Sequence, residues 1–172
     1  DMIVTHHPLI FSGLKKISPD NPVGEAVIKA VKAGISVYAA HTSADKVIAG
    51  VSGAMAARLG LKDVEILDED GDGTGLGVVG NLPEPLTAEQ AVRLVKERFG
   101  LKALRASRPV EGMISRVAMC GGSGGSLIGA AMKSGAQLYL SGDISYHNFF
   151  THEGFMIMDI GHYESEIEIV DI

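Results

Sequence analysis

The stretch FMIMDIGHYESE, residues 155–166, joins a short apolar run to a polar segment. The apolar run predicts a buried strand, because a strand covered on both faces needs no polar alternation. His162 follows this strand, and Glu166 lies four residues further on. A spacing of four places two side chains on one face of a helix. The stretch therefore predicts a strand whose carboxyl end leads into a helix carrying an imidazole and a carboxylate.

The same order of residues occurs near the N-terminus. In ISVYAAHTSAD, residues 35–45, His41 follows an apolar run and Asp45 lies four residues later. The first apolar run of the chain, MIVT, also ends in histidines, His6 and His7. We interpret this repetition as the trace of an internal duplication. If the two halves face each other, six side chains converge: His6, His7, His41, Asp45, His162 and Glu166.

Strand and helix patterns alternate along the rest of the chain. Strands are expected at 2–5, 35–40, 63–67, 77–82, 102–107, 114–120, 136–142 and 155–161, and helices at 22–34, 44–59, 87–99, 126–134, 146–153 and from 163. The alternation predicts an α/β fold of two similar strand–helix–strand halves with mainly parallel sheets, and a metal site between them at the strand carboxyl ends. We place the halves at 1–62 and 63–172, the first truncated at its N-terminus and the second at its C-terminus. The second half would include a glycine-rich loop and short strands at 68–112.

Composition narrows the class of protein. Apolar residues make up 46% of the chain and the mean hydropathy is +0.21, which indicates apolar surface buried against another chain. The net charge of −6 disfavours binding to long nucleic acid but not to nucleotides. The single cysteine, Cys120, permits no internal disulfide and predicts a reducing compartment such as the cytoplasm. No apolar run is long enough to predict a membrane span.

The histidines and carboxylates suit a divalent metal such as Zn, Fe, Mn or Ni. Two such ions can share a water and lower its pKa towards neutrality. His6 and His7 would point to opposite faces of a regular strand. At the strand end this alternation breaks, and Pro8 holds His7 extended, so both rings can reach one pair of ions. The alternative is that these histidines are ordinary polar residues at strand ends.

Two further segments are candidates for chemistry. Asp143 and His147 follow a strand and are candidates for proton transfer, the alternative being a helix cap and a surface histidine. Backbone N–H groups in a turn between strand and helix can bind phosphate, the alternative being simple tight-turn geometry. The residues of this weaker cofactor-binding candidate are Gly121, Gly122, Ser123 and Gly124. We predict that Cys120 is a buried core residue and not a nucleophile.

Five motifs in order, THHPLIF, YAAHTSAD, CGGSGGSL, SGDISYHNF and DIGHYESE, resemble those of the NIF-three-like family across nearly the whole chain. That family is also known as a dinuclear-metal-centre family and as GTP cyclohydrolase type 2 homologues. The resemblance implies two metal ions, bridged by Asp45 and Glu166 and bound also by His6, His7 and His162. It makes His41 a residue that orients a ligand or substrate, and it implies ring-shaped hexamers with the metal sites lining an internal cavity.

The chain departs from the family pattern at its ends. Family members extend beyond both termini, so the first strand and helix and most of the last helix are expected to be missing. The stretch from Gly71 to Pro109 leaves no room for the inserted domain that some members carry.

The function expected is a metal-dependent hydrolase, GTP cyclohydrolase-like, in which a metal-bridging water is the nucleophile and His147 or His41 carries protons. The alternatives are a non-enzymatic metal-binding scaffold or metallochaperone, and a phosphoesterase or nuclease.

Overall fold

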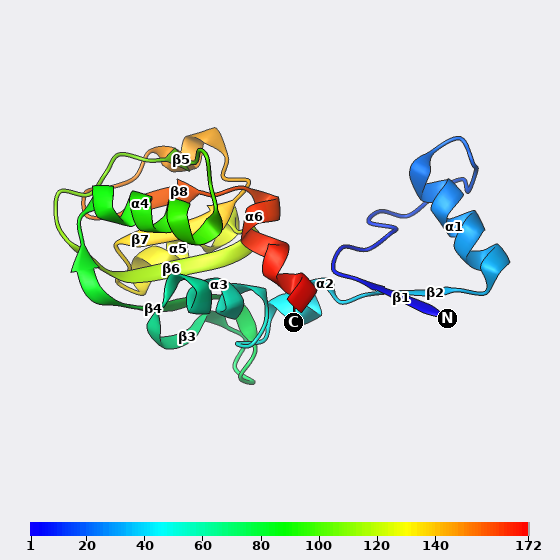
Figure 1. The fold of residues 1–172 in the computed structure, drawn as a ribbon, viewed down its shortest axis with the longest axis horizontal. Coiled ribbons are helices and arrows are strands. Elements are labelled where there is room, and N and C mark those ends of the chain that lie inside the picture. Colours follow the sequence, from blue (N-terminus) through cyan, green and yellow to red (C-terminus); the bar gives the residue numbers. More distant parts are fainter. Residues whose placement is uncertain (172) are drawn as a thin grey trace. The chain divides into compact units, whose positions relative to one another are not determined.

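A computed structural model describes residues 1–171 and divides the chain into two compact units. The first unit is Asp1–Ala44 and the second begins at Asp45 (Figure 1). The boundary that we predicted after residue 62 lies inside the second unit, within the strand Lys62–Glu69. None of the helices in the described part of the chain is long and apolar enough to cross a membrane.

The first unit is a strand–helix–strand motif. Strands β1 (Met2–Thr5) and β2 (Ser36–Ala39) pair in parallel, and α1 (Pro22–Ala33) connects them. The side chain of Asn21 caps α1 by accepting a hydrogen bond from the N–H of Gly24 at 2.8 Å. The unit ends at α2 (His41–Asp45), whose last residue already belongs to the second unit.

The second unit is built on one six-stranded sheet in the order β3-β4-β6-β7-β8-β5. The central strands β6, β7 and β8 are parallel, whereas β3, β4 and β5 pair antiparallel with their neighbours. The bounds are β3 (Lys62–Glu69), β4 (Gly75–Leu86), β5 (Arg105–Ala106), β6 (Ile114–Ser123), β7 (Leu138–Gly142) and β8 (Met156–Asp159).

Helices accompany the sheet and complete its core. Alternate residues of the central strands belong to two different apolar clusters, because side chains of a strand point to opposite faces. Helices α3 and α4 contribute to the first cluster, and α5 to the second. The bounds are α3 (Val51–Leu59), α4 (Ala88–Phe99), η1 (Gly125–Leu127), α5 (Ile128–Lys133), η2 (Tyr146–Phe149), α6 (His162–Glu166) and η3 (Ile167–Asp171).

The prediction of an α/β fold is confirmed, but that of a mainly parallel sheet is wrong for the second unit. The glycine-rich segment is a short turn joining β3 to β4, and so short a connection can join only antiparallel strands. The expected strand at 77–82 is part of the longer β4. The expected helix at 44–59 begins only at Val51, because the preceding turn folds back so that the carbonyl of Ile48 packs against Gly53. The similarity of the two halves stays a prediction.

Candidate metal centre

Three histidine rings meet at one end of the first unit. His6 and His7 follow β1, and His41 follows β2. The ring centroids lie 5.0 Å apart for His6 and His7, and 5.6 Å apart for each of them and His41. Parallel pairing explains this meeting, because the carboxyl ends of parallel strands lie at the same edge. The structure therefore brings together the three imidazoles that sequence analysis selected here.

The backbone beyond β1 and β2 fixes this cluster. The N–H of His41 donates to the carbonyl of His6 at 2.9 Å, which continues the pairing beyond the strands. The hydroxyl of Thr5 donates to the carbonyl of His7 at 2.8 Å. His41 itself has a φ of 37°, in the left-handed region. Regular strand geometry has ended at these residues, as predicted, and adjacent histidines can contribute to one cluster.

His162 lies between two carboxylates in the second unit. Its Nδ1 is 2.7 Å from Oδ2 of Asp143, and its Nε2 is 3.2 Å from Oε2 of Glu166. His162 and Glu166 begin and end α6, so the predicted spacing of four does place them together. A carboxylate can only accept, so the Nδ1–H of the neutral ring donates to Asp143. In this tautomer Nε2 is the nitrogen without a hydrogen, and it lies on the side of Glu166.

Two opposing effects act on the pKa of His162. Burial lowers this pKa, because it disfavours the charged imidazolium. The hydrogen bond with Asp143 and the negative charges of Glu166 and Asp143 raise it and outweigh burial, so the pKa lies above its ordinary value. The protein environment thus favours the protonated, positively charged form of this imidazole.

Glycine residues allow α6 to approach the sheet closely. Gly122 has a φ of 63°, and a Cβ atom there would overlap the Glu166 carboxylate. A Cβ atom on Gly142 would come within 2.8 Å of the backbone of His162. Ser165 completes the contact, because its hydroxyl accepts from the N–H of Gly122 at 2.9 Å and donates to the carbonyl of His162 at 2.8 Å. Sequence analysis missed Ser165, since a serine inside a short helix carries no spacing signal.

Asp45 and Glu166 both influence the same thiol. Cys120 is only 7% exposed. Burial, and then the negative charge of Asp45, raise the pKa of this thiol to about 11, and Glu166 acts in the same direction. Cys120 is therefore buried as predicted, and at neutral pH it is a neutral thiol and a poor nucleophile.

The backbone N–H groups of the glycine turn, residues 121–124, form hydrogen bonds with other parts of the protein. The N–H groups of Gly121, Gly122 and Gly124 donate to serine hydroxyls, at 3.2, 2.9 and 2.9 Å. These hydroxyls belong to Ser52, Ser165 and Ser141, respectively. The turn continues β6 through Ser123 and leads into the short helix η1. A phosphate bound here would have to displace the serine hydroxyls.

The two proton-transfer candidates lie in different surroundings. Asp143 follows β7 with a φ of 52° and is the partner of His162. His147 lies on η2 with an exposed side chain, and its ring centroid is 5.4 Å from that of Tyr146. The structure thus couples Asp143 directly to a predicted ligand, which fits an orienting role for this carboxylate.

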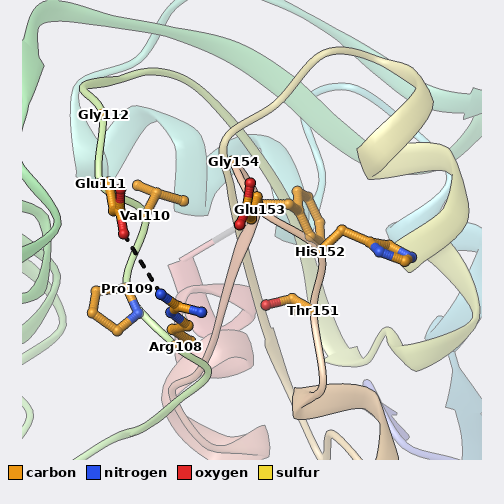
Figure 2. Close-up of a pocket in the computed structure, with 10 residues that line it drawn as sticks. Arg108, Pro109, Val110, Glu111, Gly112, Thr151, His152, Glu153 and Gly154 are labelled. Carbon is orange, nitrogen blue, oxygen red and sulfur yellow. Dashed lines mark ion pairs between the residues drawn. The ribbon is translucent and has the colours of Figure 1, made fainter.

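A separate pocket of about 210 Å³ lies between the loops at 108–112 and 151–155 (Figure 2). Arg108 and Glu111 form an ion pair at 3.5 Å across its rim, with side chains 75% and 91% exposed. Figure 2 shows the His152 ring pointing away from these two residues. None of the residues selected from the sequence lines this pocket.

Comparisons with known proteins agree with this fold and identify the family of the chain. The model of the family Duf34/NIF3 (NGG1p interacting factor 3) matches residues 1–172, so the chain belongs to this family. A Clostridium perfringens protein named GTP cyclohydrolase 1 type 2 homolog is 34% identical over 96% of the chain and 65% of its own length. A Lactococcus lactis protein of the same name is 37% identical over 95% of the chain and 64% of its own length. The chain thus spans just under two thirds of the length of these relatives.

Other relatives extend the comparison to eukaryotes and to solved structures. The Schizosaccharomyces pombe protein NIF3 homolog is 32% identical over 95% of the chain and 62% of its own length. The crystal structure of the Staphylococcus aureus hypothetical protein SA1388 matches with a TM-score of 0.87 and 25% identity, over 95% of this chain and 67% of that one. Reduced HcgD from Methanocaldococcus jannaschii matches with a TM-score of 0.80 and 26% identity, over 99% and 67%.

Proposed function

We propose that this chain provides the ligands for two divalent metal ions in a metal-dependent hydrolase. The observation that carries the proposal is the position of His162, with Asp143 on Nδ1 and Glu166 beside Nε2. Histidine ligands of metals commonly donate their other N–H to a carboxylate, which fixes the tautomer and orients the ring. The close pair of Nε2 and a carboxylate oxygen fits two donors that face one cation.

The remaining donors fit the same chemistry. The first unit supplies the three clustered imidazoles, of which His6 and His7 are the proposed ligands and His41 the orienting residue. Asp45 and Glu166 would hold the ions through their carboxylates. The proposed donors are imidazole nitrogens and carboxylate oxygens, which suit Zn, Fe, Mn or Ni. When bound, the two ions would supply Lewis acidity and a water of lowered pKa.

Several residues have proposed roles that follow from their contacts within the protein, without any assumption about the geometry of the metal ions. Asp143 keeps the proton of His162 on Nδ1 and so leaves Nε2 as an electron-pair donor. Gly122 leaves space for the Glu166 carboxylate, and Ser165 ties α6 to the glycine turn. His41 and the exposed His147 are the proposed proton carriers, because a neutral imidazole can both accept and donate a proton near neutral pH.

The names of the relatives suggest the substrate class. Two of them are called GTP cyclohydrolase 1 type 2 homolog, so we propose a nucleotide substrate and hydrolytic opening of its purine ring. A phosphoesterase acting on the same nucleotides remains the enzymatic alternative, and assay of both reactions on GTP separates the two.

A non-enzymatic scaffold is the second candidate, and one observation favours it. The first unit exposes a set of large apolar side chains, which are typical of a surface that contacts another chain. They include Met2, Val4, Phe11, Val31 and Tyr38. We therefore propose a homo-oligomer, a hexameric ring, for either function. Sedimentation of the full-length protein tests this assembly.

The experiment that tests the metal proposal is elemental analysis of full-length protein purified without added metal. We expect about two transition-metal ions per chain, and their loss in Asp45→Ala and in Glu166→Ala. His152→Ala is the matched control, because it removes an imidazole that points away from its neighbours on an exposed loop. Metal content unaffected by either ligand substitution would refute the assignment. Metal binding without hydrolysis of any nucleotide would favour the scaffold.

A further inference from the structure

A buried carboxylate with an arginine partner contacts the segments that carry Asp143 and His162. Asp159, the last residue of β8, is only 5% exposed, and its partner is Arg105 of β5. A buried carboxylate is costly unless hydrogen bonds and an opposite charge compensate it. Neither residue is part of the proposed set of ligands.

Asp159 connects two segments that carry site residues. Its Oδ1 accepts from the N–H of Gly161 at 3.0 Å, and its Oδ2 accepts from the N–H of Ile144 at 2.9 Å. Gly161 immediately precedes His162, and Ile144 immediately follows Asp143. One side chain therefore holds the two backbone segments from which the Asp143–His162 hydrogen bond is made.

Arg105 strengthens the same connection. Its Nη2 donates both to Oδ2 of Asp159 and to the carbonyl of Ile144, the latter at 3.0 Å. The guanidinium also stacks over the ring of Phe149, at 5.2 Å from the centroid. Arg105 and Asp159 together thus bind both the N–H and the C=O of the residue that follows Asp143.

The segment that carries Asp143 has a backbone conformation that needs such support, because Asp143 has a φ of 52°. Left-handed conformations of residues other than glycine are sparsely populated and persist where surrounding contacts hold them. Neither segment belongs to a strand or to the hydrogen-bonded body of a helix at these residues, so the Asp159 side chain supplies contacts that regular structure does not.

We propose that Asp159, held by Arg105, is a positioning residue that sets the Asp143–His162 hydrogen bond and thereby the tautomer of His162. The further consequence, an effect on metal affinity, rests on the proposed function. The positioning itself does not, because every contact that carries it lies within the second unit and involves no metal.

Imidazole ¹⁵N chemical shifts test the positioning in metal-free, full-length protein. They distinguish an Nδ1–H from an Nε2–H ring, and at alkaline pH the imidazoles are neutral. We expect His162 to be a single Nδ1–H tautomer in the unmodified protein and a mixture of tautomers in Asp159→Asn and Arg105→Met. Arg105→Lys, which keeps a charge beside Asp159, should retain the single tautomer.

Arg116→Met is the matched control, because Arg116 also makes an ion pair on the sheet, with Glu65, and lies away from the Asp159 contacts. This variant should keep the single tautomer. If His162 has the same tautomer in all variants, the proposal is wrong. Should Asp159→Asn fail to fold, Arg105→Met decides the question, since the Arg105 side chain is 61% exposed and its loss opens no cavity in the core.

Metal affinity, measured by competition with a chelator, separates this inference from the proposed function. A drop of about tenfold in Zn affinity in Asp159→Asn, with none in Arg116→Met, supports both the positioning role of Asp159 and the proposed function. If the unmodified protein binds no metal while its tautomer still depends on Asp159, the proposed function fails and the positioning stands. If the unmodified protein binds metal and the tautomer and affinity are unchanged in Asp159→Asn, only the positioning fails.

Discussion

Nδ1 of His162 and Oδ2 of Asp143 lie 2.7 Å apart and join the end of β7 to the start of α6. The two residues are nineteen positions apart in the sequence, and parallel pairing of β7 with β8 brings their strand ends together. The sequence suggested Asp143 as a proton-transfer residue. The hydrogen bond instead supports an orienting role, in which Asp143 determines which nitrogen of His162 is available to a cation.

Removing this orienting carboxylate should weaken metal binding. We expect Asp143→Ala to lower the affinity for Zn by about 10- to 100-fold, the usual cost of losing such a partner of a ligand. Asp143→Asn keeps a residue that tolerates the left-handed backbone and should lose less, because its amide oxygen can still accept from Nδ1–H. Glu153→Ala removes an exposed carboxylate from another loop and is the control. Equal affinities in all variants, measured by chelator competition, would contradict the orienting role.

A methyl group on Gly122 should disturb the position of Glu166. Gly122→Ala introduces both backbone strain at a φ of 63° and overlap with the Glu166 carboxylate. Gly100→Ala is a matched control, since its φ of 66° is similar and open space surrounds the added methyl. The strain alone costs roughly 1 kcal/mol in the free energy of unfolding. We expect urea unfolding to show a larger loss for Gly122→Ala, and metal affinity to fall only in that variant.

The buried thiol should make stability depend on pH in the alkaline range. The pKa of Cys120 is raised from 9.0 to about 11, so the unfolded chain ionises its thiol first and stability is lost as pH rises between these values. The loss is on the order of 2–3 kcal/mol in the free energy of unfolding. Unfolding by urea in the presence of a chelator measures it.

Cys120→Ala provides the comparison for that titration, because Tyr139 is also buried with a raised pKa and contributes in the same direction. The variant should show a shallower decline of stability with pH. Identical pH profiles for the two proteins would show that the thiol ionises as readily in the folded protein as in the unfolded chain. Slow alkylation of the folded protein at neutral pH, and fast alkylation in urea, is the corresponding kinetic result.

Core packing between α3 and the sheet should contribute strongly to the stability of the second unit. Met55 is fully buried in the cluster shared by α3, α4 and the sheet. Met55→Ala should therefore lower the free energy of unfolding by about 2–5 kcal/mol, through lost burial and the cavity left behind. Met113→Ala, at a position that is 52% exposed, should change it by less than about 0.5 kcal/mol. Denaturant titration of the two variants measures the difference.

Local signals in the sequence predicted several elements correctly because they act over a few residues. Thr87 and Gln90 form a capping box at the start of α4, where a helix was expected at 87–99. Pro22 and Gly34 mark the two ends of α1. The spacing of His162 and Glu166 likewise placed both on one short helix, because the helical repeat alone fixes that geometry.

Other features could not be predicted from short stretches of the sequence. The turn that separates α2 from α3 was missed, because it depends on the close packing of Ile48 against Gly53 and not on a stop signal. The mixed sheet was missed because strand direction depends on which strands pair, and apolar runs look alike in parallel and antiparallel sheets. The glycine turn had the composition of a phosphate loop, yet serines distant in the sequence accept its N–H groups.

The sequence by itself determined the α/β class, the order of most elements and which residues are candidate metal ligands, because periodicity, caps and residue chemistry are local properties. The tertiary structure alone decided which of these residues meet. In it, His162 is hydrogen-bonded to Asp143, and Glu166 packs against Gly122. Asp159 accepts hydrogen bonds from the two segments that carry Asp143 and His162. These relationships arise from parallel pairing of β6, β7 and β8, which gathers their carboxyl ends at one edge regardless of their separation along the chain.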